Sequence, residues 1–107
     1  MVVILLDNAI RHSPADGEVR VAVVAADRAS VLSVDDDGPG LRPEDLSRVF
    51  DRFWRAPGAP SGGTGLGLAI ATWIVRGHDG ELEVTNRPDG GARFSVRLPL
   101  SHELRPA

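Results

Sequence analysis

Apolar residues at the start of the chain are spaced for one face of a helix, which would carry Val2, Leu6, Ala9, Ile10 and Ser13. Asn8, Arg11 and His12 lie three and four positions apart, so they share a second, polar face of that helix. No capping residue precedes Met1. We therefore expect a helix, and a domain, that is truncated at its N-terminus.

Four stretches alternate between apolar and polar residues and predict strands, at 18–26, 30–35, 81–85 and 92–98. The first two are separated by a turn at 27–29, and the last two by a hairpin at 87–91. Pro43, Glu44 and Asp45 suit the first turn of a short helix, which would carry Leu46, Val49 and Phe50.

A second long helix is predicted from Leu66 to Gly77, after a stretch rich in Gly and Pro. The order of elements predicts an α+β fold, a two-layer α/β sandwich with helices on one face of a mixed, mostly antiparallel sheet. A chain of 107 residues forms one domain at most. We place that domain at 1–100 and a polar tail at 101–107.

The amino-acid composition excludes several kinds of catalytic and binding site. The chain has no cysteine and no lysine, so it has neither a thiolate site nor a P-loop lysine. A net charge of −3 argues against nucleic acid as a partner. No apolar run is long enough to span a membrane, and we expect a cytoplasmic domain, whose parent protein could still be membrane-anchored.

The glycines between Gly62 and Leu68 precede a helix, whose first N–H groups bind phosphate well. A flexible loop is the alternative interpretation. A dinucleotide fingerprint does not fit, because Leu68 stands where the third glycine is needed. Asp36, which follows a predicted strand, could accept a hydrogen bond from the amine of a ligand, although an acidic turn would have the same sequence.

On the polar helix face, Asn8 offers an oxygen that suits Mg²⁺, while Arg11 could pair with phosphate. His12 could stack on a base or contact phosphate, and a solvated helix face is the alternative. Further along, aromatic residues including Phe53 and Trp54 would dock a lid, and Phe50 could equally be core.

These four motifs, in this order, resemble the N, G1, F and G2 boxes of sensor histidine kinases. The chain is similar to their C-terminal catalytic, ATP-binding domain, whose Bergerat fold is shared with gyrase and Hsp90. The resemblance implies that Asn8 coordinates Mg²⁺ and that Asp36 accepts the adenine amino group. It implies further nucleotide contacts from Arg11, His12, Gly38, Gly40, Gly63, Thr64, Gly65, Leu66 and Gly67. An ATP lid would span about 41–62, anchored by Phe50 and Phe53, with Arg52 or Arg55 near the phosphates.

The function implied is that of a protein-histidine kinase in two-component signalling, with ATP and Mg²⁺ as cofactors. It would donate the γ-phosphoryl group to a histidine on a dimerisation domain absent from this chain, and act on a response regulator indirectly. His12, His78 and His102 lack the sequence context of such an acceptor. Ile4 stands where hydrolytic relatives carry a water-activating Glu, which disfavours an anti-sigma-type serine kinase. A degenerate or truncated module that binds ATP or a partner without transfer is the other alternative.

Overall fold

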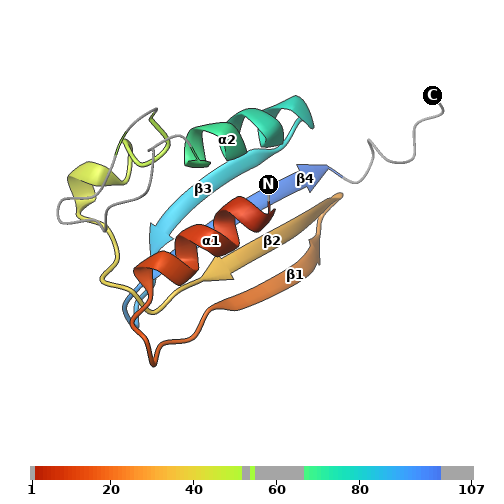
Figure 1. The fold of residues 1–107 in the computed structure, drawn as a ribbon. Helices are drawn as coiled ribbons and strands as arrows, with labels where there is room; N and C mark the ends of the chain where they lie inside the picture. Colours follow the sequence, from red (N-terminus) through yellow and green to blue (C-terminus); the bar gives the residue numbers. More distant parts are fainter. Residues whose placement is uncertain (1, 52–53, 55–66, 100–107) are drawn as a thin grey trace.

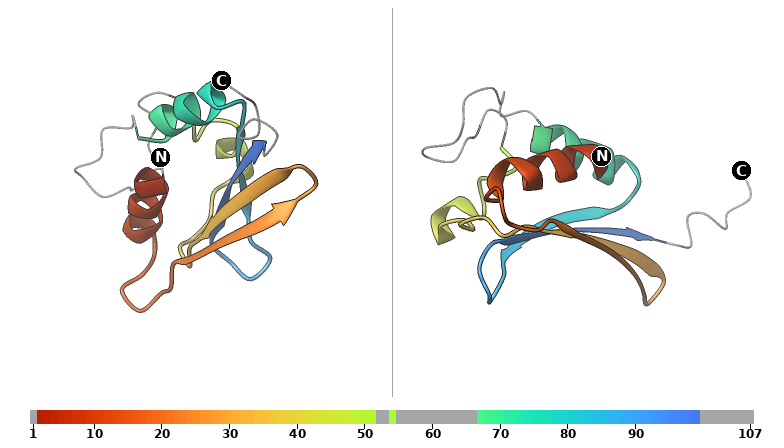
Figure 2. Two further views of the ribbon diagram at one scale, coloured as in Figure 1. Left: turned by 90° about the vertical axis from the view of Figure 1, so that its right-hand side faces the viewer. Right: turned by 60° about the horizontal axis from the view of Figure 1, so that its bottom comes forward.

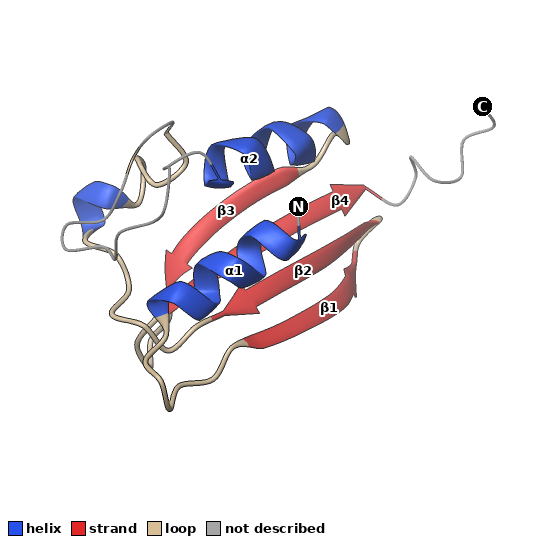
Figure 3. Cartoon of the chain, viewed as in Figure 1, coloured by secondary structure: helices blue, strands red, loops and turns tan. Residues whose placement is uncertain are grey.

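The computed structural model describes residues 2–51, 54 and 67–99, which form two helices, one short 3-10 helix and four strands (Figure 1, Figure 3). The elements in chain order are α1 (Val2–His12), β1 (Arg20–Ala26), β2 (Ala29–Asp35), the 3-10 helix (Pro43–Asp45), α2 (Gly67–Gly77), β3 (Glu81–Asn86) and β4 (Ala92–Pro99). Among the described residues, neither α1 nor α2 has the length and apolar character needed to cross a membrane.

The strands form one sheet in the order β1-β2-β4-β3. Two hairpins, β1–β2 and β3–β4, are joined by the central pairing of β2 with β4, in which Leu32 is opposite Val96. All three pairings are antiparallel, so the described strands contain no parallel pair. Both helices lie side by side on one face of the sheet (Figure 2). The predicted two-layer sandwich is confirmed.

The core lies between the helices and the covered face of the sheet. Its fully buried members are Leu5 and Ala9 of α1, Ala71 and Val75 of α2, and Val34, Phe94 and Val96 of the central strands. The buried residues of β4 follow the predicted alternation, because every second side chain of a strand points to the same face. In β1, by contrast, Val21, Val23 and Val24 are all exposed. The packing of this core holds α1 against the central strands β2 and β4.

Three details of the sequence prediction are wrong. The structure buries Leu5 and Ala9, whereas Ile10, predicted to share the face of Ala9, is 64% exposed. The reason is that α1 contacts both β2 and α2, and Ile10 lies on its outer side. The first strand begins at Arg20 rather than residue 18, because its partner β2 ends opposite, at Asp35. The predicted helix after Pro43 has only three residues, and turns continue the chain beyond it.

Candidate functional site

A pocket of about 350 Å³, a volume that includes its open mouth, lies where β2 ends and α1 ends. The described residues that line it are Asn8, His12, Asp36, Pro39, Gly40, Leu41, Val49, Trp54, Ala92 and Phe94. Most of the lining is apolar, with a few polar groups, which is typical of a site for a small organic ligand.

Asp36 is the buried carboxylate of this pocket, with 2% of its surface exposed. Its Oδ1 accepts hydrogen bonds from the N–H groups of Gly38 at 2.9 Å and Ala92 at 3.2 Å. Within the described part of the chain, its Oδ2 makes no hydrogen bond. The carboxylate is held by one oxygen and offers the other to a hydrogen-bond donor.

Two residues of the predicted polar stripe on α1 line the pocket. The Nδ1 of His12 donates to the carbonyl oxygen of Asn8 at 2.7 Å, since a carbonyl can only accept, and this fixes the ring. The side-chain amide of Asn8 makes no hydrogen bond within the described part of the chain.

Arg11, the third residue of that stripe, lies away from the described lining of the pocket. Its Nε forms an ion pair with Asp7, one turn earlier, at 2.9 Å, and its side chain is 47% exposed. Arg11 does lie on α1 with Asn8, as the spacing predicted. The pocket, however, reaches only Asn8 and His12 of the polar helix face. A contact of Arg11 with phosphate stays a prediction.

The loop after β2 packs directly on the end of α1. A Cβ atom on Gly38 would lie 2.4 Å from the carbonyl oxygen of His12, so only glycine allows this approach. The N–H of Asp37 donates to the Oγ of Ser13 at 3.1 Å. These contacts bring Asp36 of one element and His12 of another to the same pocket.

The segment after the 3-10 helix closes another side of the pocket. Phe50 packs its ring edge-on against Phe94, with centroids 6.1 Å apart and an interplanar angle of 80°. Phe50 therefore joins the core and is not among the lining residues, whereas Trp54 and the buried Val49 are. The anchoring of an ATP lid by Phe50, and its contact with nucleotide, stay predictions.

Several residues of the predicted site lie outside the described residues, namely Arg52, Phe53, Arg55, Gly63, Thr64, Gly65 and Leu66. Gly67 is the first residue of α2, and a Cβ atom on it would lie 3.4 Å from Cγ2 of Ile4. Ile4 thus lies beside the start of α2. Its hydrocarbon side chain has no group that could activate water.

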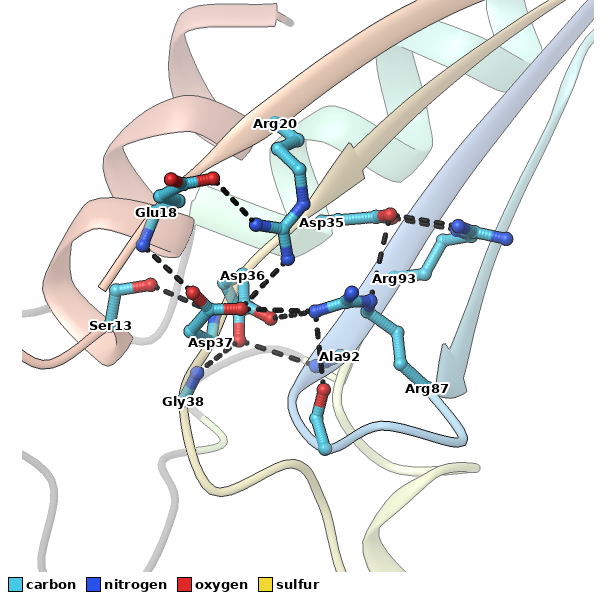
Figure 4. A network of polar contacts seen from close by, with 11 residues as sticks. Ser13, Glu18, Arg20, Asp35, Asp36, Asp37, Gly38, Arg87, Ala92 and Arg93 are labelled. Carbon is cyan, nitrogen blue, oxygen red and sulfur yellow. Dashed lines mark hydrogen bonds and ion pairs between the residues drawn. The ribbon is translucent and has the colours of Figure 1, made fainter.

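Arginines surround the acidic residues next to Asp36 (Figure 4). Arg93 forms a bidentate pair with Asp35, at 2.7 and 2.8 Å, and these hydrogen bonds lower the pKa of Asp35. The backbone N–H of Glu18 and the side chain of Arg20 donate to Asp37 and lower its pKa to about 2. Both neighbours of Asp36 are therefore ionised and paired at neutral pH.

The sequence reasoning missed the apolar walls of the pocket. Pro39, Leu41, Val49, Ala92 and Phe94 line it, but their alternation and turn signals indicate only strands and loops. Ala92 comes from the far end of the chain and no local signal relates it to Asp36. Pro39 is the exception, because it lies within the acidic motif and its place in the pocket could have been inferred from that motif.

A family model described as histidine kinase-, DNA gyrase B- and HSP90-like ATPase matches residues 1–102. The chain belongs to this family, and it is an ATP-binding domain. The resemblance to sensor histidine kinases is also confirmed. The sensor histidine kinase component HK1 of Mycobacterium tuberculosis H37Rv is 47% identical over 96 residues, which cover 89% of this chain and 56% of that protein. The histidine-protein kinase BaeS of Escherichia coli K12 is 36% identical over 104 residues, covering 94% of this chain and 22% of BaeS.

Solved structures give the same result. The mycobacterial sensor histidine kinase MprB matches with a TM-score of 0.85 at 38% identity, covering 92% of this chain and 68% of that structure. Full-length ShkA in complex with AMPPNP matches with a TM-score of 0.78 at 30% identity, covering 92% of this chain and 20% of that one. The chain therefore spans only part of the curated relatives named above.

Proposed function

We propose that this chain is the catalytic domain of a sensor histidine kinase and that it binds the adenine of ATP at Asp36. The observation that carries the proposal is the buried carboxylate at the pocket, whose Oδ2 has no partner within the described part of the chain. Adenine offers an exocyclic amine as donor and two flat apolar faces. Pro39, Leu41 and Phe94 supply the apolar contact surface around the carboxylate. ShkA, whose structure contains the ATP analogue AMPPNP, supports the choice of ligand.

The phosphate end of the nucleotide would lie toward α1. Asn8 fits as a Mg²⁺ ligand, because its amide oxygen is unpartnered in the described structure and Mg²⁺ prefers oxygen. The described residues contain no cluster of three His, Cys, Asp or Glu that could hold a metal alone. A single protein oxygen suits an ion whose other ligands are phosphates and water. Bound there, Mg²⁺ would supply neutralisation of phosphate charge.

In the whole protein, the γ-phosphoryl group would pass to a histidine of a dimerisation domain. A ring nitrogen of that histidine forms the new bond to phosphorus, the bond to the β–γ bridging oxygen breaks, and ADP leaves. The domain contributes positioning and charge stabilisation, which dominate phosphoryl transfer. Arg52 and Arg55 are proposed to contact the γ-phosphate, and a response regulator would then take the phosphoryl group from the histidine.

Calorimetry with AMPPNP and the substitution Asp36→Asn tests the nucleotide site. The amide cannot offer the charged acceptor to the adenine amine, and a hydrogen bond to a charged group is worth about 1.5–3 kcal/mol. Affinity should therefore fall about 10- to 100-fold. Asp35→Asn is the matched control, since Asp35 is adjacent and buried but does not line the pocket. Equal losses in both variants, or no binding by the unmutated chain, would refute adenine binding at Asp36.

Transfer is tested by mixing the chain with a separately produced histidine-bearing dimerisation domain and γ-labelled ATP. We expect an acid-labile phosphate on the acceptor domain, as phosphohistidine gives. Nucleotide binding without any labelled acceptor would favour the alternative of an ATP-binding module that does not act as a kinase.

A further inference from the structure

We propose that Arg87 is a positioning residue for adenine recognition, which acts through the main chain of Asp36. This inference rests on the proposed function of the pocket. Arg87 lies in the turn between β3 and β4, and its side chain is 14% exposed. Its Nη1 donates to the carbonyl oxygen of Asp36 at 2.9 Å, to Oδ1 of Asp37 at 3.1 Å and to the carbonyl oxygen of Gly90 at 3.2 Å (Figure 4). One guanidinium nitrogen thus joins the turn to the acidic loop.

The turn is itself closed by hydrogen bonds, so it presents Arg87 in one position. The N–H of Arg87 donates to the carbonyl oxygen of Gly91 at 2.9 Å, and the N–H of Gly90 donates to the carbonyl oxygen of Arg87 at 3.0 Å. Gly91 has a positive φ of 82°, and a Cβ atom there would lie 2.0 Å from the carbonyl oxygen of Asp36. The turn backbone therefore packs directly on the peptide group of Asp36.

Asp36 is consequently held at three of its polar atoms. Its N–H donates to the carbonyl oxygen of Ala92 at 3.0 Å, its Oδ1 accepts from two backbone N–H groups, and its carbonyl oxygen accepts from Arg87. Of these partners only Arg87 is a side chain within the described structure. It is thus the one contact that a substitution can remove while the backbone contacts stay.

Removal of Arg87 leaves the carbonyl oxygen of Asp36 without its donor, and it leaves Asp35 and Asp37 each without one of their arginines. The peptide group of Asp36 is then held less tightly, although its backbone contacts stay, and we expect Oδ2 to lose part of its alignment with the adenine amine. Binding geometries have to be held within about 0.5 Å for full effect. The loss should therefore be confined to ligands that use Oδ2.

The experiment compares Arg87→Met with Arg93→Met in the whole chain. Both variants lose one positive charge and one ion pair with Asp35, but Arg93 contacts neither Asp36 nor the pocket. Each is titrated by calorimetry with ATP and with purine ribonucleoside triphosphate, which has hydrogen in place of the amine. We expect Arg87→Met to weaken ATP binding about 5- to 20-fold, less than the roughly 10- to 100-fold expected for loss of the whole hydrogen bond to the carboxylate, because the bond is misaligned and not removed. Binding of the purine nucleotide should change less than about twofold, and Arg93→Met should change neither.

Equal weakening of both nucleotides by Arg87→Met would overturn the positioning role and leave a general effect of charge or folding. No weakening of ATP binding would overturn it as well. Arg87→Lys keeps the charge and tests the same point if the Met variant does not fold. It should lose less affinity, and again only for ATP. If the unmutated chain binds both nucleotides equally, adenine recognition at Asp36 fails, and the role of Arg87 fails with it.

Discussion

The position of Leu5 gives a sharp test of how α1 packs. Leu5 is fully buried between the helices and the sheet, while Ile10 on the same helix is 64% exposed. Truncation of a buried leucine to alanine costs about 2–5 kcal/mol, from lost transfer free energy and from the cavity left behind. Small domains are stable by about 5–15 kcal/mol, so Leu5→Ala removes a large part of the total. The melting temperature should fall by at least about 8 °C.

Ile10→Ala is the matched control, because it deletes a similar hydrocarbon side chain from the same helix. Its side chain is mostly in solvent, and surface substitutions usually change stability by less than about 0.5 kcal/mol. The assay is urea unfolding followed by circular dichroism, with the free energies compared at equal slopes. Equal losses in the two variants, or a larger loss for Ile10→Ala, would refute the packing of α1 described above. They would instead favour the face predicted from periodicity.

Three further predictions follow from the site and its surroundings. Because its pKa is lowered to about 2, Asp37 contributes stability that is present above its unfolded pKa, near pH 4, and is lost as the pH falls toward 2; urea midpoints of Asp37→Asn should therefore change less over that range than those of the unmutated chain. Phe50→Leu should cost about 1 kcal/mol in urea unfolding, because it removes the edge-on contact with Phe94, and an unchanged midpoint would contradict that packing. Asn8→Ala should abolish the stimulation of AMPPNP binding by Mg²⁺ in calorimetry, whereas Arg11→Ala should retain it.

The strand pattern was predictable because it depends on local alternation. Leu82 and Val84 on one strand and Phe94 and Val96 on another follow period 2, and the structure places all four on the covered face. The acidic motif could also be recognised, since Asp36 follows a strand and Gly38 and Gly40 come shortly after it. These features need no information about distant parts of the chain.

The walls and supports of the pocket could not be predicted in the same way. Ala92 reaches Asp36 across 56 residues of sequence, and Asn86 holds both backbone atoms of Leu41 across 45. Such contacts depend on which strands pair. The buried face of α1 was also mispredicted, since Leu5 and Ile10 are equally apolar and only tertiary packing distinguishes them.

The three consecutive acids at the end of β2 show how local alternation assigns different tasks to identical side chains. Val34 points into the core, so Asp35 points to the other face of the sheet, where Arg93 on the neighbouring strand pairs with it. Asp36 returns to the side of Val34, which is the side that the helices cover and the pocket opens on. Asp37 turns away again and meets arginines. Because both neighbours are paired, the free oxygen of Asp36 is the acceptor that this acidic stretch leaves available to a ligand within the described structure, and a shift of the motif by one residue would point it at the wrong face.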